Sequence, residues 1–189
     1  ELAHYAGSPF AVAVDSCSSA LFLCLKYLNK KGDQIIIPCC TYMSVPCSII
    51  NAGCRVQFKK SSPLLKGAYQ LEPTPIWDSA LRLTRNMYKE NQYMCLSFTG
   101  GKKILPLGKG GAILTDNPRA AAWFKKARYN GRNATNHLID NFTMIGWNFY
   151  MPNEVAARGL ILLGALGDNE DREQEYQDLS QYKIYTNAQ

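Results

Sequence analysis

The sequence is poor in features that mark membrane, secreted and metal-binding proteins. No stretch of its 189 residues approaches the roughly 20 apolar residues that span a bilayer. No charged N-terminal region followed by an apolar core and a cleavage site is visible, so we expect a cytoplasmic chain. None of the seven cysteines shows the CxxC spacing of a zinc or redox site, and no metal site is predicted.

The positive charge does not predict nucleic-acid binding. The formal net charge is +6, but the lysines occur in short separate pairs rather than in a basic run interleaved with aromatics. A positive field equally suits a small anion such as a phosphate or a nucleotide sugar. The odd number of cysteines favours free thiols that act as small apolar core residues in a reducing compartment.

Buried strands alternate with amphipathic helices along the chain. We predict strands at 11–14, 34–37, 54–58, 75–78, 93–98 and 111–115, and helices at 18–29, 43–52, 117–126 and 152–163. This order predicts an α/β fold with a mainly parallel sheet flanked by helices. We expect one domain over residues 1–166, followed by a polar C-terminal tail over 167–189.

Polar residues gather where the predicted strands end, which is where ligands bind in such sheets. The turn from Asp15 to Ala20 is rich in hydroxyls and opens a helix, whose free N–H groups suit a phosphate, although an ordinary N-cap explains it too. Tyr42 follows a strand, and its ring could lie on an aromatic ligand. Asp78 also ends a strand; it either caps a helix or pairs with a buried cation.

The stretch from Ser97 to Gly111 is the most informative. It leaves a strand, turns through glycines, carries paired lysines and enters another strand. The Walker spacing of a phosphate loop is absent. A lysine among apolar neighbours at a sheet edge can be partly deprotonated, as Schiff-base chemistry requires. The alternative is a basic surface hairpin.

Five segments together resemble the DegT/DnrJ/EryC1/StrS family of sugar aminotransferases, which are fold-type I enzymes dependent on pyridoxal 5'-phosphate (PLP). The family's Ser-Gly-Thr-Ala-Ala-Leu resembles Ser16–Leu21, and its Pro-x-x-Thr-aromatic resembles Pro38–Tyr42. Its Glu-Asp-Ala-Ala resembles Trp77–Ala80, and its Ser-Phe-x-x-x-Lys with a Gly-rich run resembles Ser97–Gly111. Its Gly-x-Asn-aromatic-Arg-Met resembles Gly146–Met151, with Tyr150 in place of the arginine.

The resemblance implies a role for each matching residue. Ser18, Ser19 and Ser97 would hold the cofactor phosphate. Tyr42 would stack on the cofactor ring, and Asp78 would pair with the pyridine nitrogen and keep it protonated.

Three further roles concern the lysine pair and a second subunit. Spacing from Ser97 favours Lys102 as the residue that bonds to PLP and then moves protons, and Lys103 stays as the alternative. Asn148 would reach the cofactor of a neighbouring subunit in a homodimer.

The function implied is transfer of an amino group from an amino-acid donor, glutamate, to a keto sugar nucleotide. Asp78 follows Tyr42 by only 36 positions, which is far fewer than in ordinary family members. The family's C-terminal small domain is expected to be absent. The main alternative is therefore a non-catalytic PLP- or nucleotide-sugar-binding relative with a regulatory or assembly role. A PLP-dependent sugar dehydratase is a weaker alternative, because those relatives typically carry histidine at the lysine position.

Overall fold

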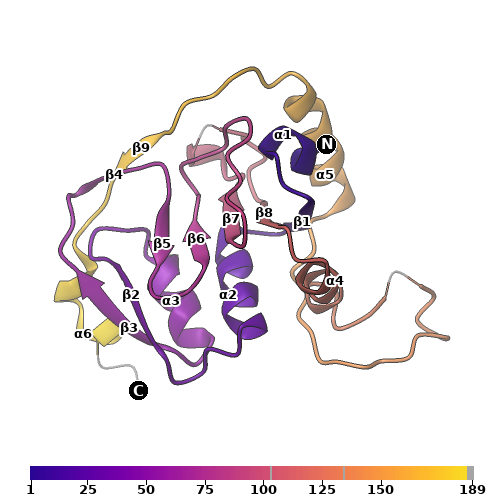
Figure 1. Cartoon of the computed structure of the whole chain (residues 1–189), viewed down its shortest axis with the longest axis horizontal. Helices are drawn as coiled ribbons and strands as arrows, with labels where there is room; N and C mark the ends of the chain where they lie inside the picture. Colours follow the sequence, from indigo (N-terminus) through magenta and orange to yellow (C-terminus); the bar gives the residue numbers. More distant parts are fainter. Residues whose placement is uncertain (103, 134, 187–189) are drawn as a thin grey trace.

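A mixed β-sheet forms the centre of the molecule (Figure 1). The computed structural model describes residues 1–102, 104–133 and 135–186, and for Lys102 it describes the backbone alone. The five strands of the central sheet lie in the order β1 (Phe10–Val14), β8 (Gly111–Thr115), β7 (Tyr93–Ser97), β6 (Ile76–Asp78) and β5 (Tyr69–Leu71). β6 and β7 pair in parallel, and the other three neighbouring pairs are antiparallel.

Two more strands extend this sheet. β2 (Gln34–Pro38) and β3 (Arg55–Lys59) form a parallel pair. Two backbone hydrogen bonds between Ile36 and Glu72, of 2.8 and 3.1 Å, join this pair to the chain just after β5. The central sheet is therefore mixed and not mainly parallel as predicted. The connections from β5 to β6 and from β7 to β8 contain no α-helix and return the chain in the opposite direction.

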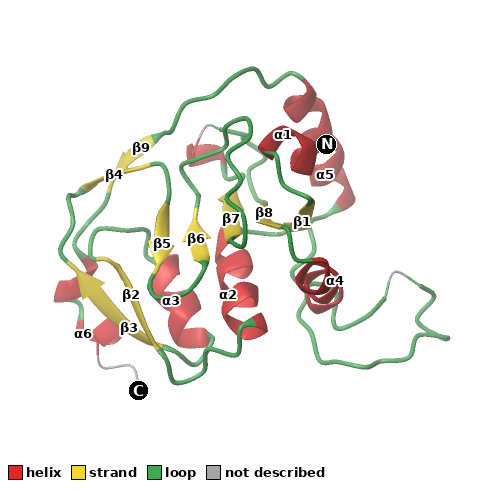
Figure 2. Cartoon of the chain, in the orientation of Figure 1, coloured by secondary structure: helices red, strands yellow, loops and turns green. Residues whose placement is uncertain are grey.

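Helices cover both faces of the sheet, which confirms the α/β class (Figure 2). α2 (Cys17–Tyr27), α3 (Ser44–Asn51) and α4 (Pro118–Ala127) pack on one face. α1 (Leu2–Ala6) and α5 (Asn153–Gly164) pack on the other. Among the described residues, no helix combines the length and the apolar character needed to cross a bilayer.

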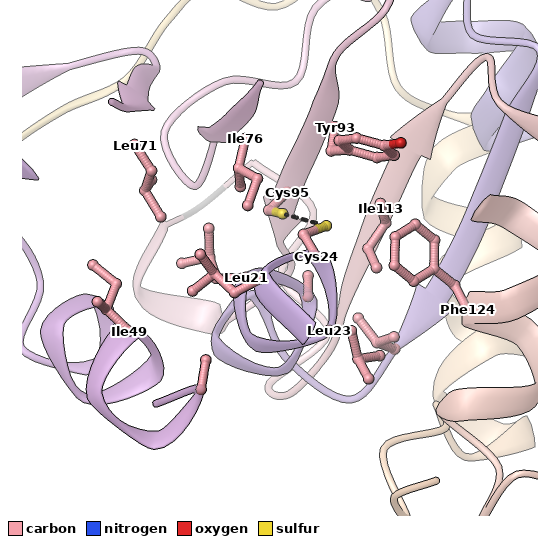
Figure 3. Packing of buried hydrophobic residues seen from close by; sticks show 14 of the residues in the cluster. Leu21, Leu23, Cys24, Ile49, Leu71, Ile76, Tyr93, Cys95, Ile113 and Phe124 are labelled. Atoms are coloured by element: carbon pink, nitrogen blue, oxygen red, sulfur yellow. Dashed lines mark hydrogen bonds between the residues drawn. The ribbon is translucent and has the colours of Figure 1, made fainter. Parts of the chain in front are cut away.

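The core explains the apolar runs of the central strands. In β7, Cys95 faces α2, whereas Met94 and Leu96 face the opposite helical layer. A strand covered on both faces needs apolar residues at every position. Figure 3 shows Cys95 against Cys24 of α2, with their sulfur atoms 3.7 Å apart. All seven cysteines are free, but Cys47 is exposed, so its assignment to the core is wrong.

All predicted helices and strands are present, with ends shifted by two residues at most. The sequence did not predict the shortest elements. These are α1, β4 (Leu64–Lys66), β5, β9 (Glu173–Glu175), the 3-10 helices η1 (Gly100–Lys102) and η2 (Leu179–Gln181), and α6 (Lys183–Thr186). Most of these elements are too short to show a hydrophobic period, and β4 and β9 also depend on pairing with each other across a long sequence separation.

Residues 167–182, called the strap below, run from α5 across the molecule toward β2 and β3 (Figure 1). β9 within the strap pairs antiparallel with β4. Two hydrogen bonds join Arg82 to Asp171, from Nε to Oδ1 at 2.7 Å and from a terminal nitrogen to Oδ2 at 2.5 Å. The buried Leu179 donates its N–H to the carbonyl of Cys39 at 2.8 Å. These contacts hold the strap against the rest of the molecule along its length.

Candidate active site

A cavity of about 300 Å³ lies beyond the carboxyl ends of β6 and β7. Its walls come from the start of α2, the turn after β2, β4 to β6, the end of β7 and the strap. The lining residues are Ser16, Cys17, Ser18, Leu21, Thr41, Tyr42, Ser44, Val45, Leu65, Gly67, Tyr69, Asp78, Ala80, Leu81, Ser97, Thr99, Gly101, Gln174 and Tyr176. This is the position at which α/β sheets bind ligands.

The start of α2 supplies hydroxyls and backbone N–H groups to one end of the cavity. The Ser16 side chain caps the helix by accepting the N–H of Ser19 at 3.1 Å. Ser18 lines the cavity and donates its hydroxyl to Ser44 at 2.7 Å. Ser19 is buried, with its Oγ 2.9 Å from that of Ser16, so its hydroxyl faces the cap.

Gly111 allows α2 to start this close to the sheet. A Cβ atom there would lie 2.5 Å from the carbonyl carbon of Ser16 and 2.7 Å from the backbone nitrogen of Cys17. Both neighbours are backbone atoms that cannot rotate away. The glycine therefore brings the hydroxyl-rich turn next to the end of β7.

Asp78 lies at the end of β6 and is only 5% exposed. Its Oδ1 accepts the N–H of Ala80 at 2.9 Å, and its Oδ2 accepts the hydroxyl of Tyr69 at 2.9 Å. The Cys17 sulfur lies 3.7 Å from Oδ1. No helix follows Asp78 in the described residues 79–92, so the helix-capping alternative is wrong. The hydrogen bond from Ala80 belongs to a turn, and the carboxylate faces the cavity.

The end of β7 brings the predicted lysine segment to the cavity. Ser97 lines the cavity, and its Oγ lies 3.3 Å from that of Thr99. Gly101 lines the cavity too, and the backbone of Lys102 follows it as the last residue of η1. Lys103 lies outside the described residues.

Two aromatic rings meet at the cavity, one from each side. Tyr42 follows β2, and Tyr176 belongs to the strap; their ring centres are 6.4 Å apart at 61° between planes. Burial, and then the nearby charge of Asp78, raises the pKa of Tyr176 well above its usual value. Tyr69, Gln174 and Tyr176 were missed from the sequence. A short hairpin brings Tyr69 to the cavity, and the pairing of the strap with β4 brings Gln174 and Tyr176 there.

The structure therefore gathers Ser18, Tyr42, Asp78 and Ser97 around one cavity. Lys102 follows the lining residue Gly101 in η1. Ser19 lies behind the turn. Asn148 is exposed, bridges to Tyr129 and does not line the cavity. A planar ligand with an anionic group near α2 and a basic ring nitrogen near Asp78 would match these groups.

A model of the DegT/DnrJ/EryC1/StrS aminotransferase family matches residues 1–64 and 85–185. The chain belongs to this family. Aminotransferases of the DegT/DnrJ/EryC1/StrS family depend on PLP. The unmatched residues 65–84 contain Tyr69 and Asp78, which both line the cavity. No curated protein matches the chain.

Several solved structures share the fold. AtS13 from Actinomadura melliaura has a TM-score of 0.71 at 18% identity, over 87% of this chain and 58% of its own. DesV from S. venezuelae, solved with a ketimine intermediate, has a TM-score of 0.70 at 19% identity, over 87% of this chain and 54% of its own. PseC from Helicobacter pylori, an aminotransferase involved in pseudoaminic acid biosynthesis, has a TM-score of 0.70 at 15% identity, over 87% of this chain and 56% of its own. The chain thus spans little more than half the length of these structures.

Proposed function

We propose that this cavity binds PLP. The observation that carries the proposal is a buried carboxylate, Asp78, in the same cavity as the hydroxyl-rich start of α2. A carboxylate at this depth is stabilised by a ligand that brings a positive charge. The helix start offers N–H groups and a positive dipole end to a phosphate. Membership of a PLP-dependent family supports the same ligand.

Each residue at the cavity would then have a defined task. Ser18 and Ser97 would donate hydroxyls to the phosphate, and Ser19 would support them by holding the cap of α2. The Tyr42 ring would cover one face of the cofactor ring. Asp78 would keep the proton on the pyridine nitrogen, and Lys102 would bond to the cofactor and move protons at the substrate carbon.

We propose amino transfer as the reaction, from glutamate as donor to a keto sugar nucleotide. PLP, when bound, supplies an electron sink for the bond that is broken at the amino-bearing carbon. The family description and the family of sugar aminotransferase structures support this class of reaction. The net charge of +6 suits anionic substrates such as nucleotide sugars.

Covalent trapping tests the proposal. The protein is mixed with PLP, reduced with borohydride, digested and mapped by mass spectrometry. We expect a visible absorption band before reduction and a pyridoxyl group on Lys102 afterwards. Lys102→Ala should lose the group, and Lys103→Ala should retain it. Folded protein that gives no band and no adduct contradicts the proposal, and an adduct on Lys103 reverses the lysine assignment.

A non-catalytic PLP- or nucleotide-sugar-binding relative is the second candidate. Tyr176 favours it, because this strap residue lines the cavity and its ring contacts that of Tyr42. Amino transfer measured with glutamate and a panel of keto sugar nucleotides separates the two candidates. Sustained turnover excludes a purely binding role, and PLP binding without turnover on any of them supports it.

We propose a homodimer as the working form and the cytoplasm as its location. The segment between α4 and α5 carries four exposed apolar side chains, and Asn148 lies just after them. These side chains are Leu138, Ile139, Phe142 and Ile145. A second subunit that covers them would remove apolar surface from water and bring Asn148 to another cavity. Seven free cysteines are in keeping with a reducing compartment.

A further inference from the structure

Tyr69 and Asp78 face each other across a short hairpin. They are direct partners in the antiparallel pairing of β5 with β6. Opposite residues in such a pair extend their side chains to the same side of the sheet, close enough to interact. Here the phenol oxygen lies 2.9 Å from Oδ2 of Asp78. The contact thus follows from the register of two strands.

The hydrogen bonds around Tyr69 run in one direction. Its single hydroxyl hydrogen is donated to Asp78, since an ionised carboxylate only accepts. The oxygen of Thr41 lies 2.6 Å from the same phenol oxygen, so Thr41 must be the donor in that bond. The order is therefore Thr41 to Tyr69 to Asp78. A tyrosine that accepts one hydrogen bond becomes a better donor of the next.

Other groups also surround the carboxylate. Cys17 approaches from the start of α2, and the backbone N–H of Ala80 binds it from the following turn. Cys95 of β7 and Tyr176 of the strap lie near enough to feel its charge. From across the hairpin, the Tyr69 hydroxyl donates a hydrogen bond to Oδ2 at 2.9 Å.

We propose that Tyr69 is a positioning residue that fixes the orientation of Asp78 and keeps it ionised for a cationic ring nitrogen. The inference deepens the proposed function and rests on PLP as the ligand. Tyr69 lies in residues 65–84, which the family model does not match, so the case for its role rests on the geometry of this chain.

The electrostatics of the tyrosine support this task. Burial, and then the charge of Asp78, raises the pKa of Tyr69 well above its usual value. The phenol therefore stays protonated across the neutral range and remains a donor. A donor to the ionised form lowers the pKa of a carboxyl group. Removing the hydroxyl should raise the pKa of Asp78.

The test measures Asp78 directly and needs no cofactor. Carboxylate carbon NMR of the PLP-free protein follows the titration of Asp78 in wild type, Tyr69→Phe and Thr41→Val. We expect Tyr69→Phe to raise the midpoint by about one pH unit or more, the value of a hydrogen bond to a charged group. Thr41→Val should raise it less. Tyr88→Phe is the matched control, because its hydroxyl also donates and accepts, outside the cavity.

PLP binding provides the second measurement. PLP affinity should fall as the pH drops through the Asp78 midpoint. In Tyr69→Phe this fall should begin at a higher pH, in step with the raised midpoint, and in Tyr88→Phe it should occur at the wild-type pH. Equal Asp78 midpoints in wild type, Tyr69→Phe and Thr41→Val overturn the inference. If Tyr69→Phe does not fold, Thr41→Val decides alone. If the Asp78 midpoint moves but wild type does not bind PLP, the proposed function fails and the orientation by Tyr69 stands.

Discussion

At the scale of single residues, Asp78 stands out as a carboxylate buried in the candidate site. It is almost fully buried and receives hydrogen bonds from a backbone N–H and a phenol. Such an arrangement keeps a carboxylate charged in a place where water is scarce. An amide of the same shape would preserve the packing and remove the charge.

We therefore expect Asp78→Asn to weaken PLP binding by roughly 100-fold or more, since breaking a buried charge pair is strongly unfavourable. Equilibrium dialysis measures the dissociation constant, with Asp33→Asn as a control on the exposed ion pair to Lys30. Asp33→Asn should bind PLP as wild type does. An Asp78→Asn variant with unchanged affinity would remove Asp78 from the cofactor site.

A site residue can be predicted from the sequence when it lies at a recognisable strand or helix end. Asp78 and Ser97 end buried strands, and Ser18 begins a helix, so local pattern is enough to find them. Tyr69 reaches the site through a hairpin whose turn contains Pro73 and Pro75, and those turn residues could have predicted it. Tyr176 had no local signal, because only the pairing of β9 with β4 brings it there.

At the scale of elements, the start of α2 depends on the missing side chain of Gly111. Gly111→Ala should destabilise the protein by about 1–3 kcal/mol, because the added methyl meets backbone atoms and overpacking is unfavourable. Urea unfolding measures the free energy. Gly164→Ala in α5 is the control, since a Cβ there meets nothing within 4 Å. It should be neutral or slightly stabilising. Equal stabilities of both variants would contradict the close approach.

The strap is the second element with a testable anchor. Arg82 and Asp171 have side chains 26% and 21% exposed, whereas those of Arg85 and Asp168 are 55% and 89% exposed. Exposed ion pairs contribute little. Asp171→Asn should therefore increase tryptic cleavage after Arg172 at neutral pH, and Asp168→Asn should change it little. Equal cleavage of the two variants would mean that the ion pair does not hold the strap.

The strap should also respond to pH. Hydrogen bonds from Arg82 hold the pKa of Asp171 below its usual value. A group with a lowered folded pKa contributes stability above its unfolded pKa, near 3.9, and loses it as pH falls through the folded value. Wild-type strap should be evenly protected above about pH 5 and should lose its protection progressively as the pH falls toward and through the lowered pKa of Asp171. Pepsin digestion across acidic pH measures this, and Asp171→Asn should lack that dependence.

At the scale of the whole molecule, the positions of Asn148 and the exposed apolar segment before it lead to an experiment on pairs of subunits. If each site combines its own Lys102 with the partner subunit's Asn148, then neither Lys102→Ala nor Asn148→Ala alone forms a complete site. Dissociating and reassociating a mixture of the two variants gives mixed dimers. In each mixed dimer, the subunit that keeps Lys102 receives Asn148 from the other, so one site is complete.

Titration with PLP should then reveal sites of wild-type affinity in the mixture and in neither variant alone. Asn148→Ala by itself should bind PLP about tenfold more weakly, the value of one hydrogen bond to a charged phosphate. If each site is built within one chain, the mixture should contain no site of wild-type affinity, because every subunit then carries a defect of its own. A mixture without restored sites, in dimers whose assembly is verified by light scattering, would assign Asn148 to its own chain or to no site.

Phe142→Asp should abolish the restoration of sites in the mixture, because a charge on the exposed segment prevents a second subunit from covering it.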